Sequence, residues 1–177
     1  MNILVCGNID HGKTWTIYAL MKTLERRFGI KNEYTENAMT EDPDYMINEH
    51  PFHLLFDFEG RKYHFFDFFN IKDYEIYFAD PENIPDAALF VIAANEGFIG
   101  PGNAFSDRQR LGQGERTLKL LRQKGIEKLV VYVNKVDLED DEELLELFEF
   151  DLVDKLEEYG YSDVPIIYGA SKYACHF

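Results

Sequence analysis

The sequence Gly-Asn-Ile-Asp-His-Gly-Lys-Thr at residues 7–14 decides the fold of this chain. It follows the apolar run Ile-Leu-Val-Cys at residues 3–6, which is typical of a buried strand, and it opens an amphipathic stretch that reaches Phe28. A glycine at each end lets such a loop curl until successive backbone N–H groups point inward toward an anion. The placement between a strand and a helix therefore predicts a phosphate-binding loop.

Six residues of this loop are predicted to surround the phosphates of a nucleotide. Lys13 is placed to reach the β- and γ-phosphates, and the Thr14 hydroxyl is placed to bind Mg²⁺. We expect the side chain of His11 to be structural. The full predicted phosphate-binding set is Asn8, Asp10, His11, Gly12, Lys13 and Thr14.

A second motif, Asn-Lys-Val-Asp at residues 134–137, directly follows the strand-like run 129–133. An amide and a carboxylate at this position can read the edge of a guanine, so Asn134, Lys135 and Asp137 are predicted guanine-binding residues. A polar turn after a buried strand needs similar residues, and the motif alone leaves that structural interpretation open. Because ligands of doubly wound α/β domains bind outside the carboxyl ends of the strands, the two motifs together predict GTP or GDP.

The rest of the chain alternates between expected strands and helices. Apolar alternation predicts an antiparallel hairpin around Glu59 and Gly60, and continuous apolar runs predict buried parallel strands. The pattern predicts a single GTP-binding domain over residues 1–177, with a three-layer α/β P-loop NTPase fold whose mostly parallel sheet carries one antiparallel edge hairpin. The expected strands are 3–6, 52–58, 62–67, 88–94, 129–133 and 165–168, the expected helices are 13–28, 115–124 and 141–159, and 30–51 and 96–114 are expected to be irregular.

Composition excludes several classes of protein. The net charge of −15, from 33 acidic and 18 basic residues, argues against direct binding of a nucleic-acid backbone, which needs a basic face. No window holds the roughly 18 apolar residues of a membrane span, and the first residues run straight into a strand. Cys6 and Cys175 are too few for a disulfide framework and have no metal-binding spacing. We expect a cytoplasmic protein.

These motifs resemble the GTP-binding domain of translational GTPases, with elongation factor Tu as the nearest type. Residues 7–14 resemble that family's Gly-His-Val-Asp-His-Gly-Lys-Thr, and residues 134–137 with the acidic run that follows resemble its guanine segment and next helix. Residues 169–171, Gly-Ala-Ser, fall where the family carries Gly-Ser-Ala, so the resemblance implies that Ala170 and Ser171 contact the guanine. Asp67 matches the family carboxylate near the Mg²⁺ ion. The resemblance implies that Asp67 lies behind direct ligands such as Thr14 and does not bind the ion itself.

The chain departs from the family pattern at the switches. Where the family has Asp-Cys-Pro-Gly-His, residues 67–71 read Asp-Phe-Phe-Asn-Ile. Asn70 replaces the glycine whose N–H meets the γ-phosphate, and Ile71 replaces the histidine that orients the attacking water. An alkyl side chain cannot hydrogen-bond water, so no catalytic residue is secure and hydrolysis is expected to be weak. Counting back from Asp67 puts Asn48 at the position of the Mg²⁺-binding switch threonine.

Two further departures concern length. The stretch 97–114 is longer than its family equivalent, and we interpret it as an inserted structural loop. The chain stops at residue 177, before a further helix and before the tRNA-binding β-barrel domains of the family. This implies a shortened chain or a loss of tRNA delivery, and we expect exposed apolar surface at the last strand unless a partner covers it.

Three functional hypotheses follow. The first is an elongation-factor-Tu-like GTPase domain with weak or absent hydrolysis, which binds GTP or GDP with Mg²⁺ and contacts the translation machinery or another protein. The second is a pseudo-GTPase, a regulatory module that uses the nucleotide structurally. The third is a P-loop kinase acting on a small substrate, which would leave residues 134–137 without a role.

Overall fold

The computed structural model describes residues 1–30, 52–68, 71–98 and 112–174. Asn48, Asn70, Cys175 and most of the expected 96–114 loop lie outside these ranges. The elements are β1 (Asn2–Gly7), α1 (Lys13–Phe28), β2 (Phe52–Phe58), β3 (Arg61–Asp67), α2 (Ile71–Tyr77), the 3₁₀ turn η2 (Pro81–Asn83), β4 (Ala87–Ala93), α3 (Gln113–Gln123), β5 (Leu129–Asn134), the 3₁₀ turn η3 (Val136–Leu138), α4 (Glu142–Glu158), β6 (Ile166–Tyr168) and α5 (Ser171–Ala174).

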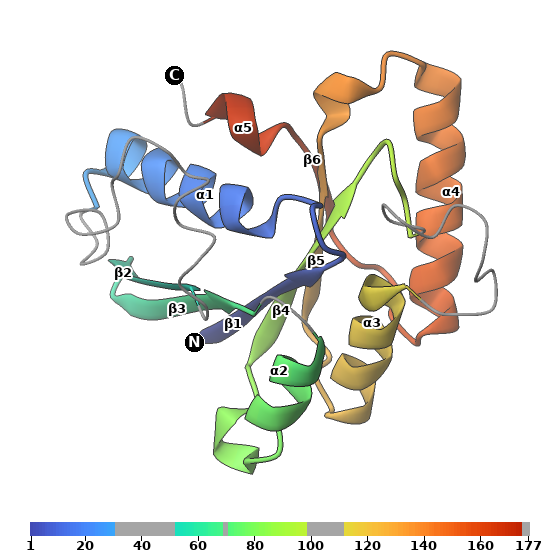
Figure 1. The fold of residues 1–177 in the computed structure, drawn as a ribbon. Helices are drawn as coiled ribbons and strands as arrows, with labels where there is room; N and C mark the ends of the chain where they lie inside the picture. Colours follow the sequence, from blue (N-terminus) through green and yellow to red (C-terminus); the bar gives the residue numbers. More distant parts are fainter. Residues whose placement is uncertain (31–51, 69–70, 99–111, 175–177) are drawn as a thin grey trace.

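The described strands form one six-stranded sheet in the order β2-β3-β1-β4-β5-β6 (Figure 1). β1 lies at its centre and pairs in parallel with both β3 and β4, and the sheet continues in parallel through β5 to β6. Among these strands, the hairpin β2–β3 supplies the one antiparallel pair, in which Leu54 faces Phe65. The predicted fold class is confirmed.

Helices cover both faces of the sheet, as predicted (Figure 1). α1 lies on one face, where its residues Ile17 and Met21 are buried against Val5 and Val91. α2, α3 and α4 lie on the other face, over a larger core that includes Leu4, Phe90 and Val131. Since strands buried on both faces need apolar residues at every position, this packing explains the continuous apolar runs of β4 and β5.

The helix limits follow from local capping. α1 has the predicted limits, and Gly29, at φ 66°, ends it by donating its N–H to the Glu25 carbonyl at 3.0 Å. α4 begins one residue later than predicted, because the Asp141 carboxylate caps it by accepting the N–H of Glu143. α3 begins two residues earlier than predicted. The last two residues of the expected loop 96–114 therefore belong to the first turn of α3. β4 starts and ends one residue earlier.

One helix of the structure was missed from the sequence. No helix was predicted at Ile71–Tyr77, where the structure has α2. This helix of seven residues is too short to show a clear period, and it is held by tertiary packing of the fully buried Tyr74. Phe28, at the end of the amphipathic stretch, is 56% exposed in the last turn of α1, where it packs edge-to-face on Phe58.

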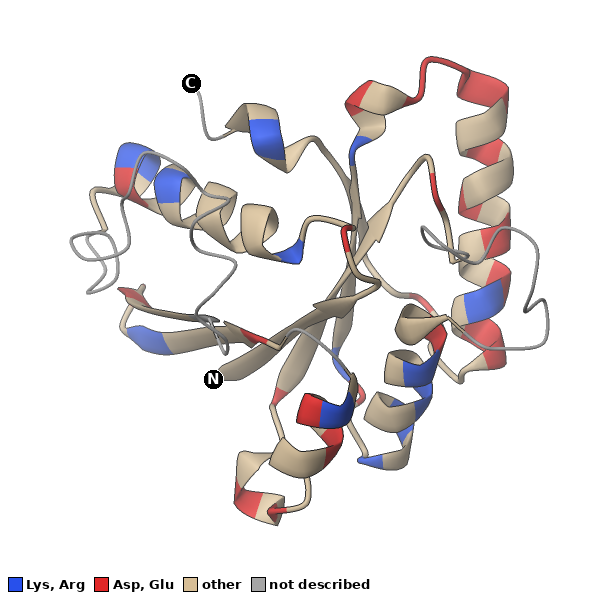
Figure 2. Ribbon diagram, in the orientation of Figure 1, with Lys and Arg blue, Asp and Glu red and all other residues tan. Residues whose placement is uncertain are grey.

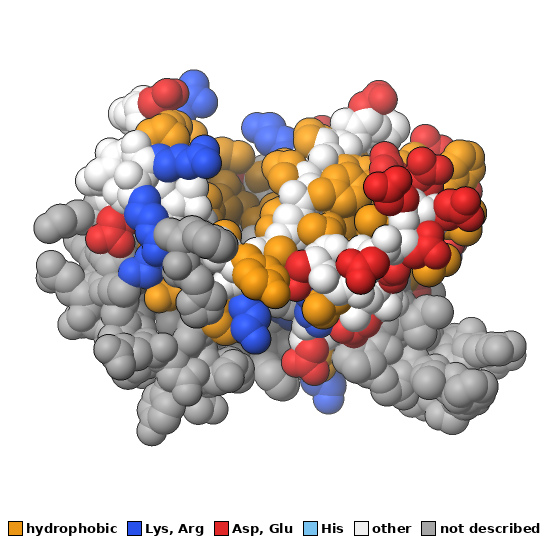
Figure 3. All heavy atoms as spheres, turned by 90° about the horizontal axis from the view of Figure 1, so that it is seen from above, with side chains coloured by type: hydrophobic (Ala, Val, Ile, Leu, Met, Phe, Trp, Pro, Cys, Tyr) orange, Lys and Arg blue, Asp and Glu red, His pale blue; other side chains and the backbone are white. Residues whose placement is uncertain are grey.

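The surface is strongly acidic on one side of the molecule. Figure 2 shows acidic residues along most of α4, and Figure 3 shows exposed apolar side chains beside an acidic band. The expected apolar exposure at the last strand is present, since Ile167 is 52% and Tyr168 41% exposed. Within the described ranges, no helix combines the length and apolar character needed to cross a membrane.

Candidate functional site

The loop between β1 and α1 passes close to two neighbouring strands. Gly7, at φ 140°, lies so near β4 that a Cβ there would collide with the carbonyl oxygen of Val91. Gly12, at φ 88°, leaves room in the same way for the side-chain amide of Asn134. Both positions combine a positive φ with a close approach, which explains why the loop needs glycine at each end.

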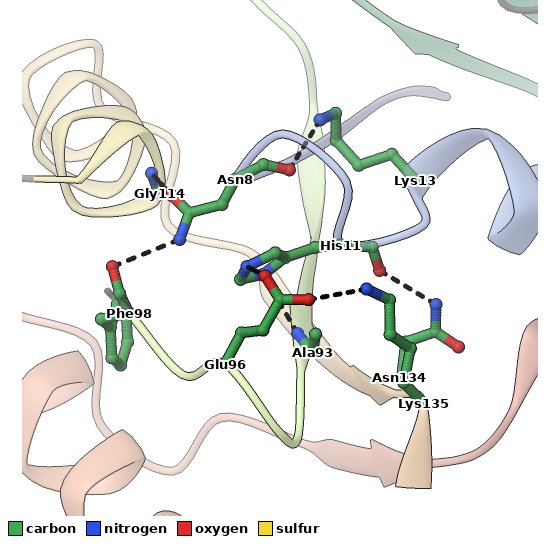
Figure 4. Close-up of polar contacts among 9 residues, drawn as sticks. All are labelled: Asn8, His11, Lys13, Ala93, Glu96, Phe98, Gly114, Asn134 and Lys135. Atoms are coloured by element: carbon green, nitrogen blue, oxygen red, sulfur yellow. Dashed lines mark hydrogen bonds and ion pairs between the residues drawn. The ribbon is translucent and has the colours of Figure 1, made fainter. Parts of the chain in front are cut away.

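Lys13 lies at the first turn of α1, where the backbone N–H groups are free to face an anion. Its ammonium donates a hydrogen bond of 2.9 Å to the carbonyl oxygen of Asn8, so the side chain folds back over the loop (Figure 4). Burial lowers the pKa of Lys13, and the negative charge of Asp67 opposes that shift. A buried cation over a helix N-terminus is suited to hold phosphate groups.

Thr14 and Asp67 meet at the same end of the sheet. The Thr14 hydroxyl donates to a carboxylate oxygen of Asp67 at 3.3 Å, and Asp67, the last residue of β3, is fully buried. Hydroxyl and carboxylate oxygens are the ligands that Mg²⁺ prefers, so this pair fits the predicted metal. In the part of the chain that the structure covers, no three His, Cys, Asp or Glu side chains converge on a metal position.

Asn134 connects the loop to the other end of the chain. Its side-chain N–H donates to the His11 carbonyl at 2.9 Å, and its side-chain oxygen accepts the Ser171 N–H at 2.9 Å. The Ser171 hydroxyl lies 3.0 Å from the Thr16 hydroxyl. Three segments that are distant in sequence, 7–14, 134–137 and 169–171, therefore lie in contact with one another.

The described groups of Ser171 point into the protein. Its N–H bonds to Asn134 and its hydroxyl lies against Thr16, so we expect the backbone N–H of the neighbouring Ala170 to be the donor that faces a base. Asp137 lies in the single turn η3 and is exposed. Asp10 is also exposed, with a left-handed φ of 65°. The predicted base-reading side thus presents a carboxylate and a backbone N–H.

His11 is fully buried beneath the loop (Figure 4). Its Nδ1 accepts the Ala93 N–H at 3.0 Å, and burial, with the charges of Lys135 and Lys13, lowers its pKa to about 3. The imidazole is therefore neutral, with its proton on Nε2. As expected, the side chain is structural, and only the backbone of His11 can face a phosphate.

The Asn8 side chain also points away from the predicted phosphate position. Its amide N–H donates to the Phe98 carbonyl at 3.2 Å, and its oxygen accepts the Gly114 N–H at 2.5 Å. Asn8 therefore joins the loop to both ends of the segment between β4 and α3. This role was not predicted, because the partners lie about 90 and 106 positions away and form no motif.

Glu96 is a site residue that sequence reasoning missed. It follows β4, and its carboxylate oxygens reach the Lys135 ammonium at 2.8 Å and His11 Nε2 at 3.7 Å (Figure 4). Nothing in the local sequence distinguishes it from the 32 other acidic residues of the chain. Only its place at the end of a central strand sets it apart.

Phe68 and Ile71, which follow Asp67, both pack against the core. The Phe68 side chain is buried, and its carbonyl accepts the Tyr74 hydroxyl at 3.2 Å. Ile71, the first residue of α2, is partly buried and packs against the main core. An apolar side chain held in this way offers no group that can orient water.

Together, these groups can cradle a polyphosphate, bind a hard cation and read a polar base edge. The family model described as the elongation factor Tu GTP binding domain matches residues 1–176.

Proposed function

Because the chain belongs to the elongation factor Tu GTP-binding domain family, we propose that it binds GTP and GDP at the loop of residues 7–14. The backbone of the loop and the ammonium of Lys13 hold the phosphates. Asp137 accepts the N–H groups of the guanine, and the N–H of Ala170 donates to its carbonyl. Ser171 and Asn134 hold the base-reading segment against the loop.

The observation that carries this proposal is the double hydrogen bond of the buried Asn134. It fixes residues 134–137 relative to residues 7–14, so that a ligand bound by the loop meets the base-reading residues. A polar turn with only a structural role after β5 would not require hydrogen bonds to both residues 7–14 and residues 169–171.

Mg²⁺ is proposed as the metal that accompanies the nucleotide. Thr14 would contribute its hydroxyl to the ion, and Asp67 would orient that hydroxyl or bind water on the ion. The metal would supply positive charge to the β- and γ-phosphates. Asn48, predicted as a further ligand, remains a proposal from sequence.

We propose that GTP hydrolysis is slow or absent. Enzymatic hydrolysis needs a group that orients the attacking water, and Ile71 stands where the family histidine would do this. The packing of Ile71 and the anchoring of Phe68 by Tyr74 support the same view.

The same anchoring favours the second candidate, a pseudo-GTPase. If the segment after Asp67 keeps one conformation, the protein holds nucleotide as part of its structure and its partner affinity is equal with GTP and GDP. A protein of the translation machinery and a cytoplasmic location are proposed from the family.

Calorimetric titration of the full chain with GDP, GTP and ATP, with and without Mg²⁺, tests the binding proposal. We expect guanine nucleotides to bind and ATP not to compete, whereas preferential ATP binding would favour the kinase hypothesis. Single-turnover hydrolysis of bound GTP tests the second proposal, and turnover as fast as in stimulated members of the family would contradict it.

A further inference from the structure

We propose that Glu96 is a positioning residue for guanine-nucleotide binding, whose carboxylate fixes the Lys135 side chain beside the base. This inference rests on the proposed function. It concerns a residue outside every motif of the sequence, and it follows from the contacts that Glu96 makes across the end of the sheet.

The first observation is the ion pair itself. The Lys135 ammonium and a Glu96 oxygen are 2.8 Å apart, and the two side chains are 25% and 21% exposed. The residues come from the turns that follow β4 and β5, which are adjacent parallel strands in which Ala93 faces Asn134. The pair therefore spans the two strands at the carboxyl end of the sheet, where the nucleotide is proposed to bind.

Lys135 needs such a partner because its side chain has four rotatable bonds. Ordering a free lysine side chain costs conformational entropy, and that cost would otherwise be part of nucleotide binding. Its backbone is already fixed in the left-handed region, at φ 61°. With Glu96 holding the ammonium, the whole residue is ordered before a ligand arrives.

A second contact ties Glu96 to the phosphate loop. The other carboxylate oxygen lies 3.7 Å from His11 Nε2, which carries the imidazole proton because Nδ1 accepts the Ala93 N–H. Both atoms are buried, and the described residues give neither of them a hydrogen-bond partner. Glu96 thus lies between Lys135 and the loop, as Figure 4 shows, and contacts both sides of the proposed site.

The negative charge of Glu96 should also weaken nucleotide binding by repulsion, which is opposite to the effect of positioning Lys135. A test must distinguish these two effects. A carboxylate near the site repels the phosphates of any nucleotide, so removing it through Glu96→Gln would tighten binding if charge alone mattered. Loss of Lys135 positioning would weaken binding instead. Only the second effect needs Lys135.

The test is a double-mutant cycle with GDP and Mg²⁺, using calorimetry on the full chain. We expect Glu96→Gln to weaken GDP binding roughly five- to tenfold in the natural background and to have no effect on a Lys135→Met background. Equal effects in the two backgrounds, or tighter binding, would overturn the proposal.

Glu115→Gln is the matched control. Glu115 is 12% exposed and contacts a lysine, Lys155, at 3.4 Å, and none of the contacts described for it involves Lys135. We expect its GDP affinity to equal that of the natural chain, and an equal loss there would contradict a specific role for Glu96.

Two comparisons distinguish failure of the proposed function from failure of the proposed role of Glu96. If the natural chain does not bind GDP, the proposed function fails, whereas binding by the natural chain with no coupling refutes only the role of Glu96. If Glu96→Gln does not fold, Glu96→Asp replaces it in the cycle, and failure of both to fold would show that Glu96 acts on the fold, which also overturns the proposal.

Discussion

The side-chain amide of Asn134 donates a 2.9 Å hydrogen bond to the backbone carbonyl of His11, which lies 123 positions away in the chain. The contact is buried, and the oxygen of the same amide accepts the Ser171 N–H. One side chain therefore holds the loop after β1, the turn after β5 and the start of α5 in a single arrangement.

Asn134→Ala is expected to destabilise the fold and to abolish nucleotide binding. It leaves the His11 carbonyl and the Ser171 N–H buried without their partner, which costs about 1–3 kcal/mol each. Urea unfolding should show a free energy of unfolding lower by about 2–6 kcal/mol. Asn83→Ala is the control, because in the described part of the chain the Asn83 side chain donates one hydrogen bond, to the Tyr77 carbonyl, from the turn η2. A similar decrease in the free energy of unfolding of the control would show that Asn134 has no special role in stability.

Asp137→Asn is expected to exchange the base preference from guanine to xanthine. An amide can donate where the carboxylate accepted, so it pairs with the carbonyl that xanthine has in place of the guanine amino group. Because Asp137 is exposed, the fold should be unaffected. Titration with GDP and xanthosine diphosphate measures the exchange, and unchanged GDP affinity would show that Asp137 does not read the base.

Thr14→Ala is expected to weaken Mg²⁺ binding to the nucleotide complex while leaving the helix intact. The hydroxyl that contacts Asp67 is lost, and we expect the apparent Mg²⁺ affinity of the nucleotide complex to fall roughly 10- to 100-fold. Thr23→Ala is the control on the same helix, since the Thr23 hydroxyl bonds only the Ala19 carbonyl in the described part of the chain. Titration of Mg²⁺ into the GDP complex tells the two variants apart.

His11→Asn is expected to make stability less sensitive to acid. The pKa of His11 is about 3 in the folded protein, against an ordinary 6.5, because burial and two lysines disfavour its charged form. Between pH 6.5 and 3 the unfolded chain binds the extra proton, so the stability from neutral His11 is complete above pH 6.5 and is lost as the pH falls through this range.

The slope of this loss is about 1.4 kcal/mol per pH unit. Asparagine keeps an acceptor for the Ala93 N–H but does not titrate, so His11→Asn should lose stability less steeply by about that amount. Denaturant unfolding between pH 4 and 6.5 makes the comparison. Parallel curves for the two proteins would mean that His11 is not the buried titrating group.

Local patterns were enough for most of the fold. The first helix has the limits that its spacing and Gly29 predict, and the hairpin and the parallel strands lie where the apolar runs place them. Such elements can be predicted because the apolar period and the capping residues depend only on residues that are close in the sequence. Helix α2 was missed for the opposite reason, since its seven residues depend on contacts with distant parts of the core.

The candidate site, like the fold, could be predicted from the sequence only in part. From the sequence alone we could predict which residues form a phosphate loop and a base-reading segment, because a glycine loop between strand and helix and a tetrad after a buried strand are local arrangements. Only the tertiary structure decided how these segments are joined. The bonds from Asn134 to His11 and from Glu96 to Lys135 span 123 and 39 positions, and a pairing at that distance depends on how strands and helices pack, which no local pattern encodes.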